Sequence, residues 1–187
     1  MKFEPLSVHG AFEVSIEPNS DDRGFFARLW CRDEFAAHGI TVDMLQANVS
    51  YNRAAGTVRG MHFARLPAME GKLVRCQRGR AHDVIVDIRS DSPTYLASAS
   101  VELRADRHNA IWVPYGVAHG FQTLEADTEI VYLMSDRYRP ELAGGYRFDD
   151  PAFGIRWPMP PSVIAERDLA YPPFGSGREV AAAFDAR

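Results

Sequence analysis

The chain has 187 residues, enough for one domain with a full hydrophobic core. Hydrophobic residues make up 46% and charged residues 25% of the sequence, which excludes a wholly disordered chain. The formal net charge of -4 gives no overall attraction to nucleic acid or to an anionic membrane, so a local cluster of Lys and Arg has to hold any anionic partner.

The N-terminal region and the cysteines indicate where the protein works. No apolar run reaches the roughly 18 to 20 residues needed to cross a bilayer, and residues 1–14 have no apolar core of a signal peptide. Cys31 and Cys76 lack the spacing of a disulfide scaffold or a zinc site. We therefore expect a cytoplasmic protein in a reducing compartment, with neither a membrane nor a nucleic acid as partner.

The first predicted element is a short helix. Residues 32–39 (RDEFAAHG) have a helical pattern that stops at Gly39. Two β-rich runs follow at residues 73–77 and 82–88, with a turn signal at Gly79 between them. This pattern predicts a β-hairpin.

Four further β-rich runs follow along the chain. They lie at residues 98–104, 109–114, 120–125 and 128–135, and turn-forming Pro, Gly or Asp follows each. Short strands about ten residues apart are typical of sandwiches and barrels. The predicted fold class is all-β, a jelly-roll (cupin-like) barrel or sandwich with a few short peripheral helices.

The C-terminal region is rich in proline. Residues 157–177 indicate an extended segment rather than an interdomain linker, and residues 178–187 indicate a frayed or helical tail. The sequence has no internal repeat and no low-complexity segment. We therefore predict one domain over residues 1–187, with the C-terminal segment from about residue 158 wrapping the barrel.

Residues 56–76 gather basic side chains around one histidine. His62 lies near Arg59 and Lys72, and a small barrel holds its ligand in the mouth, among inward side chains of several strands. The segment alone leaves three roles open for His62: a buried structural histidine, a metal ligand or a proton carrier. His82 and His108 have no comparable neighbours, which favours structural roles for both.

Other kinds of site have weaker support. Residues 114–119 (PYGVAH) match one half of a metal-binding cupin signature, which makes His119 a candidate ligand. The other half needs an early His-x-His and a carboxylate, whereas Phe63 and Ala64 follow His62, so we expect no metal. The nucleophile elbow and the Gly-rich phosphate loop are absent too, so side chains have to hold any phosphate.

Nine segments in order along the chain carry a family resemblance. They are DDRGFFARLW (21–30), QANVS (46–50), GTVRGMHF (56–63), KLVRCQRG (72–79), DVIVDIRSDSPT (83–94), VPYGVAHGFQTL (113–124), YLMSDRYRP (132–140), FDDPAFGIRWP (148–158) and ERDLAYP (166–172). Together they resemble the dTDP-4-dehydrorhamnose 3,5-epimerase family of nucleotide-sugar epimerases. The family has a jelly-roll fold that dimerises, so the resemblance implies this fold and a homodimer.

The resemblance implies an epimerase that acts on a nucleotide-diphosphate 4-keto-6-deoxyhexose in deoxysugar or polysaccharide biosynthesis. The C4 carbonyl acidifies the hydrogens at C3 and C5, so a base can remove one as a proton and leave an enolate. Reprotonation from the opposite face inverts C5, C3 or both. Such a reaction needs no metal and no redox cofactor.

The resemblance also implies roles for individual residues. Four match the family's catalytic groups: His62 as the base, Asp168 as the carboxylate that orients it, Tyr132 as the acid and Lys72 as the cation beside the C4 oxygen. Six match its substrate contacts: Arg23, Arg59 and His119 for the diphosphate and sugar, Gln46 and Asn48 for polar groups, and Tyr138 for stacking on the base.

The sequence departs from the family pattern at two acidic positions. Arg28 stands where the family usually has Glu after RGFF-x, and Ala143 replaces a second Glu shortly before residues 148–151. Both positions belong to the substrate-contacting set, so Arg28 is a further substrate-binding candidate and we expect an altered base or sugar preference. The loop at residues 50–57 is one residue longer than usual.

Two other functional classes are alternatives. A barrel that only binds a nucleotide sugar would keep Arg59 and Lys72 without needing His62, Tyr132 and Asp168 together. A metal-dependent cupin enzyme is the second alternative, and it would bind iron, nickel or zinc.

Overall fold

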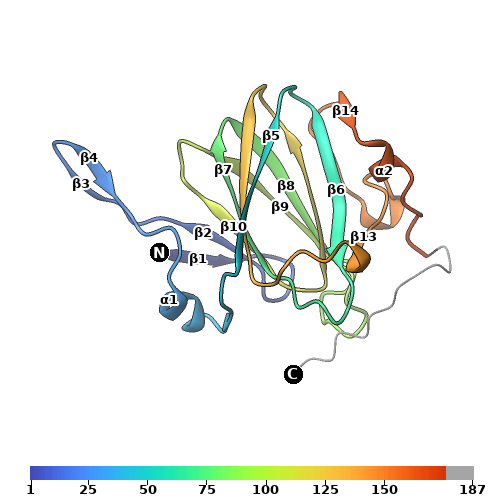
Figure 1. Cartoon of the computed structure of the whole chain (residues 1–187), viewed down its shortest axis with the longest axis horizontal. Helices are drawn as coiled ribbons and strands as arrows, with labels where there is room; N and C mark the ends of the chain where they lie inside the picture. The colour runs from blue at the N-terminus through green and yellow to red at the C-terminus, as the bar shows by residue number, and fades with distance from the viewer. Residues whose placement is uncertain (176–187) are drawn as a thin grey trace.

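The computed structural model describes residues 1–175, and its strands form two stacked sheets (Figure 1). The first sheet contains, in spatial order, β1 (Lys2–Pro5), β2 (Phe12–Ser15), β10 (Ala110–Val113), β7 (Lys72–Arg78), β12 (Thr128–Met134) and β5 (Gln46–Asn52). The second contains β13 (Ala143–Gly145), β6 (Thr57–Ala64), β11 (Val117–Thr123), β8 (Arg80–Asp87) and β9 (Ser98–Arg104), with β14 (Val163–Ile164) parallel to β6. The predicted all-β class is confirmed.

Helical elements are short and lie around the sandwich. They are α1 (Arg32–Ala36), α2 (Glu166–Leu169) and the 3-10 turns η1 (Pro140–Leu142) and η2 (Pro151–Phe153). The helix predicted over residues 32–39 is confirmed, and the backbone turns at Gly39 with φ of +79°. No helix within residues 1–175 has the length and apolar character needed to cross a membrane. A separate hairpin of β3 (Asn19–Asp21) and β4 (Gly24–Phe26) projects from the sandwich (Figure 1).

The turn at Gly79 corrects one prediction. It joins β7 to β8, but β7 pairs with β10 and β12 in the first sheet, whereas β8 pairs with β9 and β11 in the second. The hairpin prediction is therefore wrong, because the chain crosses from one sheet to the other at Gly79. Glycine is required there because φ is +79° and because a Cβ at this position would lie only 2.5 Å from Oγ1 of Thr128.

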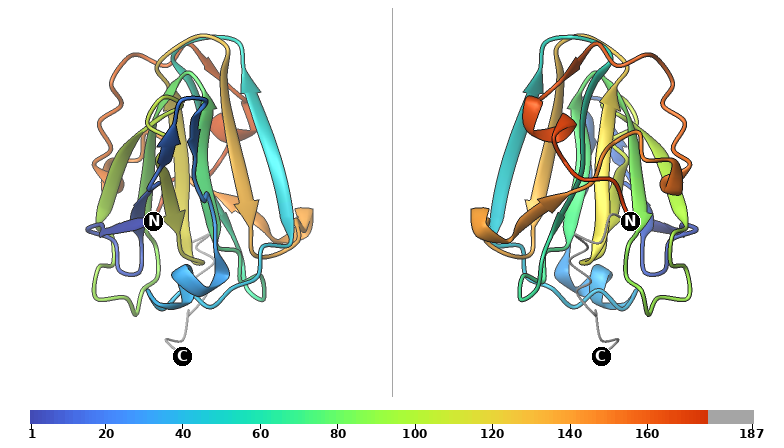
Figure 2. Two further views of the ribbon diagram at one scale, coloured as in Figure 1. Left: turned by 90° about the vertical axis from the view of Figure 1, so that its left-hand side faces the viewer. Right: turned by 90° about the vertical axis from the view of Figure 1, so that its right-hand side faces the viewer.

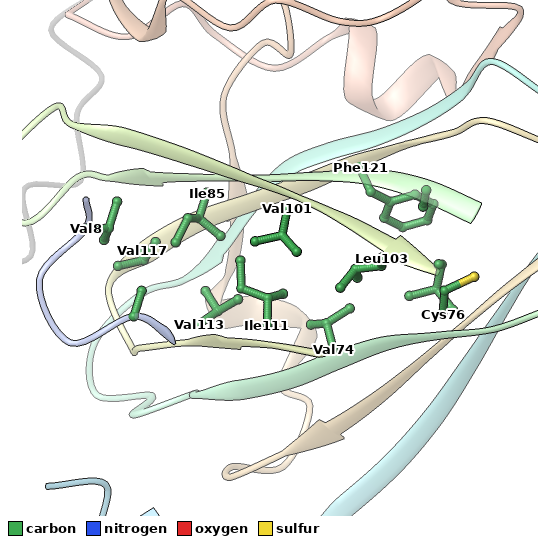
Figure 3. Packing of buried hydrophobic residues seen from close by; sticks show 13 residues of the cluster. Val8, Val74, Cys76, Ile85, Val101, Leu103, Ile111, Val113, Val117 and Phe121 are labelled. Atoms are coloured by element: carbon green, nitrogen blue, oxygen red, sulfur yellow. The ribbon is translucent and has the colours of Figure 1, made fainter. Parts of the chain in front are cut away.

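The main core lies between the two sheets (Figure 3). Alternate residues of the strands point into it, which is the period-2 pattern of a strand with one face on a core. It contains Val8, Ala11, Val74, Cys76, Ala81, Ile85, Val101, Leu103, Ile111, Val113, Val117, Phe121 and Ile130. Each large apolar side chain buried in this way contributes about 1.5–3 kcal/mol.

The outer face of the second sheet is covered by the C-terminal part of the chain. Met61 and Phe63 of β6 pack there with Tyr146 and Phe153, and Phe174 closes over them. β14 and α2 run beside β6 (Figure 2). This packing carries α2 to the strand that holds His62. The predicted tail at 178–187 lies outside the described residues, and one domain over 1–187 stays a prediction.

Candidate active site

A cavity of about 330 Å³ opens between the two sheets. Strands β5, β7 and β12 of the first sheet form one wall, and β6, β11 and β13 of the second sheet form the other. Seven of the predicted site residues line it: Asn48, Arg59, His62, Lys72, His119, Tyr132 and Tyr138. Segments from residue 48 to residue 138 therefore converge on one place.

His62 lines this cavity with its ring held from behind by Asp168. Nε2 of His62 lies 2.8 Å from Asp168 Oδ1, and Asp168 Oδ2 accepts the backbone N–H of Gly60 at 3.2 Å. Burial acts to raise the pKa of Asp168, but the hydrogen bonds from His62 and Gly60 and the charge of Arg167 hold it below its usual value. An ionised carboxylate only accepts, so Nε2–H donates to it and Nδ1 is the basic atom of the ring.

A β-bulge at Gly60 brings His62 to the cavity. On β11, two steps separate His119 from Phe121, whereas their partners on β6, His62 and Arg59, are three residues apart. In a regular strand Arg59 and His62 would face opposite sides, and the extra residue lets both face the cavity. Glycine is required because φ is +130° and a Cβ would lie 2.6 Å from the backbone of β11.

His119 forms a second histidine–carboxylate pair, deeper than the first. Its Nε2 lies 2.8 Å from Asp83 Oδ2, and the two side chains are 5% and 0% exposed. His119 is the cross-strand partner of His62, and its ring lies edge-on to that of Tyr132. Across residues 1–175, no three His, Cys, Asp or Glu side chains gather in a way that could hold a metal ion.

Tyr132 lies on β12, in the wall opposite His62. Burial, and to a smaller extent the negative charge of Asp83, raises the pKa of its hydroxyl far above the ordinary value, and Arg59 offsets this only in part. Tyr132 therefore keeps its proton at physiological pH. The cavity thus has a basic imidazole on one wall and a protonated phenol on the other.

Lys72 begins β7 and extends into the same cavity. Its Nζ lies 3.0 Å from Glu70 Oε1, and each of these side chains is 10% exposed. A charge with so little contact with water needs a partner of opposite charge close by. Glu70 supplies that charge.

The three polar and aromatic contacts predicted near β5 lie together at the rim. Gln46 Nε2 donates to Asn48 Oδ1 at 2.9 Å, and Gln46 Oε1 accepts the backbone N–H of Tyr138 at 3.2 Å. Asn48 lines the cavity, whereas Gln46 lies behind it, and Tyr138 is 54% exposed. The glutamine thus links the strand to the loop that carries the tyrosine ring.

The sequence of this chain matches one known protein family. The family model of dTDP-4-dehydrorhamnose 3,5-epimerase matches residues 5–176. This chain belongs to that family. A dTDP-4-dehydrorhamnose 3,5-epimerase of Sinorhizobium fredii is 42% identical over 173 residues, which are 92% of this chain and 89% of the relative. A dTDP-4-dehydrorhamnose 3-epimerase of Streptomyces niveus is 35% identical, over 90% of this chain and 81% of that protein.

Solved structures of family members have the same fold. The RmlC epimerase of Mycobacterium tuberculosis is 36% identical with a TM-score of 0.88, covering 93% of this chain and 88% of its own. The Legionella pneumophila epimerase, solved with dTDP-4-keto-L-rhamnose, is 30% identical with a TM-score of 0.85, covering 92% of each chain. The resemblance that the nine sequence segments indicated is confirmed, and so is the jelly-roll fold.

Two predicted substrate contacts lie away from the cavity within this chain. Arg23, on the β3–β4 hairpin, is 89% exposed in its side chain and pairs with Asp21 at 2.5 Å. Arg28 pairs with Glu34 near α1, also at 2.5 Å, and is 61% exposed. Neither lines the cavity, whereas Ala143, the other departure from the epimerase family pattern, does. The substrate roles of Arg23 and Arg28 stay predictions.

Four charged residues and one tyrosine line the cavity without having been predicted: Glu70, Arg137, Arg139, Arg167 and Tyr171. Sequence position offered a clue for four of them, because Arg137 and Arg139 flank Tyr138, Arg167 precedes Asp168, and Glu70 lies two residues before Lys72. Tyr171 had no such clue. Its ring lies against the backbone of Gly145 and edge-on to His62, with ring centroids 5.8 Å apart.

Proposed function

We propose that this epimerase inverts C5, C3 or both of a nucleotide-diphosphate 4-keto-6-deoxyhexose in deoxysugar biosynthesis. One observation carries the proposal: a basic histidine and a protonated tyrosine face one cavity from opposite sheets. A sugar ring between them has one face toward each group. Inversion of a carbon centre needs this geometry, because the proton has to leave from one face and return to the other.

The reaction begins with removal of a proton next to the C4 carbonyl. His62 takes the proton, and the negative charge of Asp168 stabilises the imidazolium that forms. The electron pair of the C–H bond moves to the C4 oxygen as an enolate, and the Lys72 ammonium stabilises that oxygen. Tyr132 then donates its proton to the other face of the carbon. The substrate gains and loses one proton, so the step balances without an oxidant or reductant.

Basic residues at the cavity support a nucleoside diphosphate as the anionic part of the substrate, which stays attached to the sugar throughout the reaction. Arg59, Arg137 and Arg167 line the cavity, and guanidinium groups bind phosphate oxygens in pairs. The exposed ring of Tyr138 offers a surface on which a base can stack. The relative from Bacillus anthracis was solved with TDP and pyrophosphate bound, so thymidine is the nucleoside that we propose.

A homodimer is the proposed assembly. Arg23 matches a family substrate contact but lies on a projecting hairpin, away from the cavity of its own chain. On the same hairpin, Phe25 and Phe26 are 51% and 81% exposed, and such apolar side chains are typical of an interface. A second copy that covers these rings would also allow Arg23 to reach the partner's cavity.

The cysteines support a cytoplasmic location. Cys31 and Cys76 are both free thiols. Burial raises the pKa of Cys76 to about 11, so its thiol stays protonated and unreactive at neutral pH. Two free cysteines suit a reducing compartment.

Solvent hydrogen exchange tests the function. The protein is incubated in heavy water with a dTDP-4-keto-6-deoxyhexose, and NMR follows deuterium at C3 and C5. We expect incorporation at one or both carbons. In His62→Ala it should fall by about 10²- to 10⁴-fold, the usual contribution of a general base. His9→Ala, an exposed histidine outside the cavity, is the matched control.

The native chain and the His62→Ala variant test different parts of the proposal. No incorporation into thymidine, cytidine or guanosine 4-keto sugars by the native chain would refute the epimerase function. Native rates in His62→Ala would leave the function standing but refute the role of His62 as the base.

A further inference from the structure

The cavity contains a single acidic residue among the described residues that line it, Glu70. Asp168 and Asp83 contact the two histidines from behind, whereas Glu70 faces the cavity itself. A carboxylate near the carbon that becomes an enolate would oppose the reaction unless a cation neutralises it. The proposed mechanism does not use Glu70, although its carboxylate faces the cavity in which the enolate forms.

The backbone on both sides of Glu70 is held by the segment that follows β12. Met69 N–H donates to Asp136 Oδ2 at 3.1 Å, and Gly71 N–H donates to Ser135 Oγ at 2.7 Å. The carbonyl of Gly71 accepts the N–H of Ser135 at 2.9 Å. Ser135 Oγ also donates to the carbonyl of Met69 at 3.1 Å. Four hydrogen bonds therefore fix the loop that carries the carboxylate of Glu70.

The partner of Glu70 is an unusual residue in this sequence. The chain contains only two lysines, Lys2 and Lys72, and uses arginine at all its other cationic side chains apart from histidine. Arginine keeps its charge in almost any surroundings, whereas a lysine with little water around it gives up its proton readily unless a negative charge holds it. Lys72 is only 10% exposed and its Nζ lies 3.0 Å from Glu70.

We propose that Glu70 is a positioning residue that keeps Lys72 charged and fixes its Nζ where the enolate oxygen forms. The proposal rests on the proposed function, because it gives Lys72 the task of stabilising that oxygen. The four-carbon stem of lysine has many rotamers, and the ion pair selects one of them. Glu70 acts through Lys72 and needs no contact with the substrate.

Two substitutions separate the charge of Glu70 from its hydrogen bond. Glu70→Gln keeps an oxygen that accepts from Lys72 Nζ but removes the negative charge, whereas Glu70→Ala removes both. At pH 6.5 we expect kcat of Glu70→Gln within about threefold of native and kcat of Glu70→Ala lower by about 10²-fold, the cost of a misplaced catalytic group. KM should change little in both.

Raising the pH separates these variants further. The alkaline limb of the kcat profile should move to lower pH in Glu70→Gln, because an ammonium without its counter-ion loses its proton sooner. A residue that only stabilises the fold would lower stability without moving this limb. Glu141→Gln, an exposed glutamate outside the cavity, is the matched control and should follow the native profile.

NMR of the lysines tests the proposal without turnover. Protein labelled with ¹³C-lysine has two Cε signals, and Lys72→Gln assigns them. In both Glu70 variants the Cε signal of Lys72 should move from its native position, because the ion pair that selects its rotamer is lost or weakened, while Lys2 serves as an internal reference. An unchanged Lys72 signal in both Glu70 variants, together with native kcat profiles, would overturn the role of Glu70. Lack of deuterium exchange by native protein would instead refute the proposed function.

Discussion

Asp168→Asn is the change that tests the histidine–carboxylate pair most directly. The two oxygens of Asp168 both accept: Oδ1 from Nε2 of His62 at 2.8 Å and Oδ2 from the backbone N–H of Gly60 at 3.2 Å. Asparagine has one acceptor and one donor in the same space. Its NH₂ group therefore has to face either His62 or Gly60, whichever way the amide turns.

The two orientations of the amide have different costs. If the NH₂ group faces His62, the ring has to accept at Nε2, so the proton moves to Nδ1 and the base is lost. If the NH₂ group faces Gly60, two donors meet in a site that is 2% exposed, which costs about 1–3 kcal/mol of stability. In both cases the charge that stabilises the imidazolium is gone. We expect exchange to fall by about 10²- to 10⁴-fold.

Deuterium exchange at C3 and C5 measures the loss of the base, and urea unfolding measures the loss of stability. Asp149→Asn is the control, because Asp149 is a partly exposed carboxylate that pairs with Arg147 at 2.8 Å outside the cavity. Exchange by Asp168→Asn within twofold of native would refute the reasoning, since it would mean that His62 needs no carboxylate behind it.

Two other predictions concern the acid and the pH dependence of stability. Tyr132→Phe keeps the ring but removes the proposed acid, so NMR should show inversion lowered by about 10²- to 10⁴-fold. Inversion at the native rate would mean that another group donates the proton. For Asp87, burial acts to raise the pKa, but hydrogen bonds from Arg89, Ser92 and Thr94 outweigh it and lower the pKa. Ionised Asp87 therefore contributes its full share to the free energy of unfolding above its pKa in the unfolded chain, about 3.9. That contribution is lost as the pH falls through the lower pKa that Asp87 has in the folded protein. In urea unfolding, Asp87→Asn should cost about 3–5 kcal/mol at pH 6, with the difference shrinking below pH 4; a constant difference down to pH 2 would contradict this sign.

Strands β7 to β12 were predictable because their residues follow the apolar pattern of a strand on a core, whereas β1 to β6, β13 and β14 were not predicted from the sequence. The runs at residues 98–104 and 128–135 correspond to β9 and β12, and the short helix ends at Ala36, three residues before the turn at Gly39. The partners of the strands were not predictable. The same turn chemistry at Gly79 serves a hairpin or a corner between sheets, and local sequence does not distinguish them.

The candidate site was predictable through the family motifs rather than through strand periodicity. Strict alternation separates Arg59 from His62, and only the paired strand reveals the bulge at Gly60. Glu70 was missed because a lone glutamate in a loop is usually a solvated charge. Tyr171 was missed because its place depends on the absence of a side chain at Gly145, in another strand.

His62 and Asp168 are far apart in the sequence, so they are synthesised at different times. All the residues of the core between the sheets lie at or before Ile130, whereas the carboxylate follows its histidine by 106 positions. A ribosome therefore delivers every part of that core before it delivers Asp168. His62 is therefore synthesised together with the strands of the core, and the carboxylate that orients its ring is added after them.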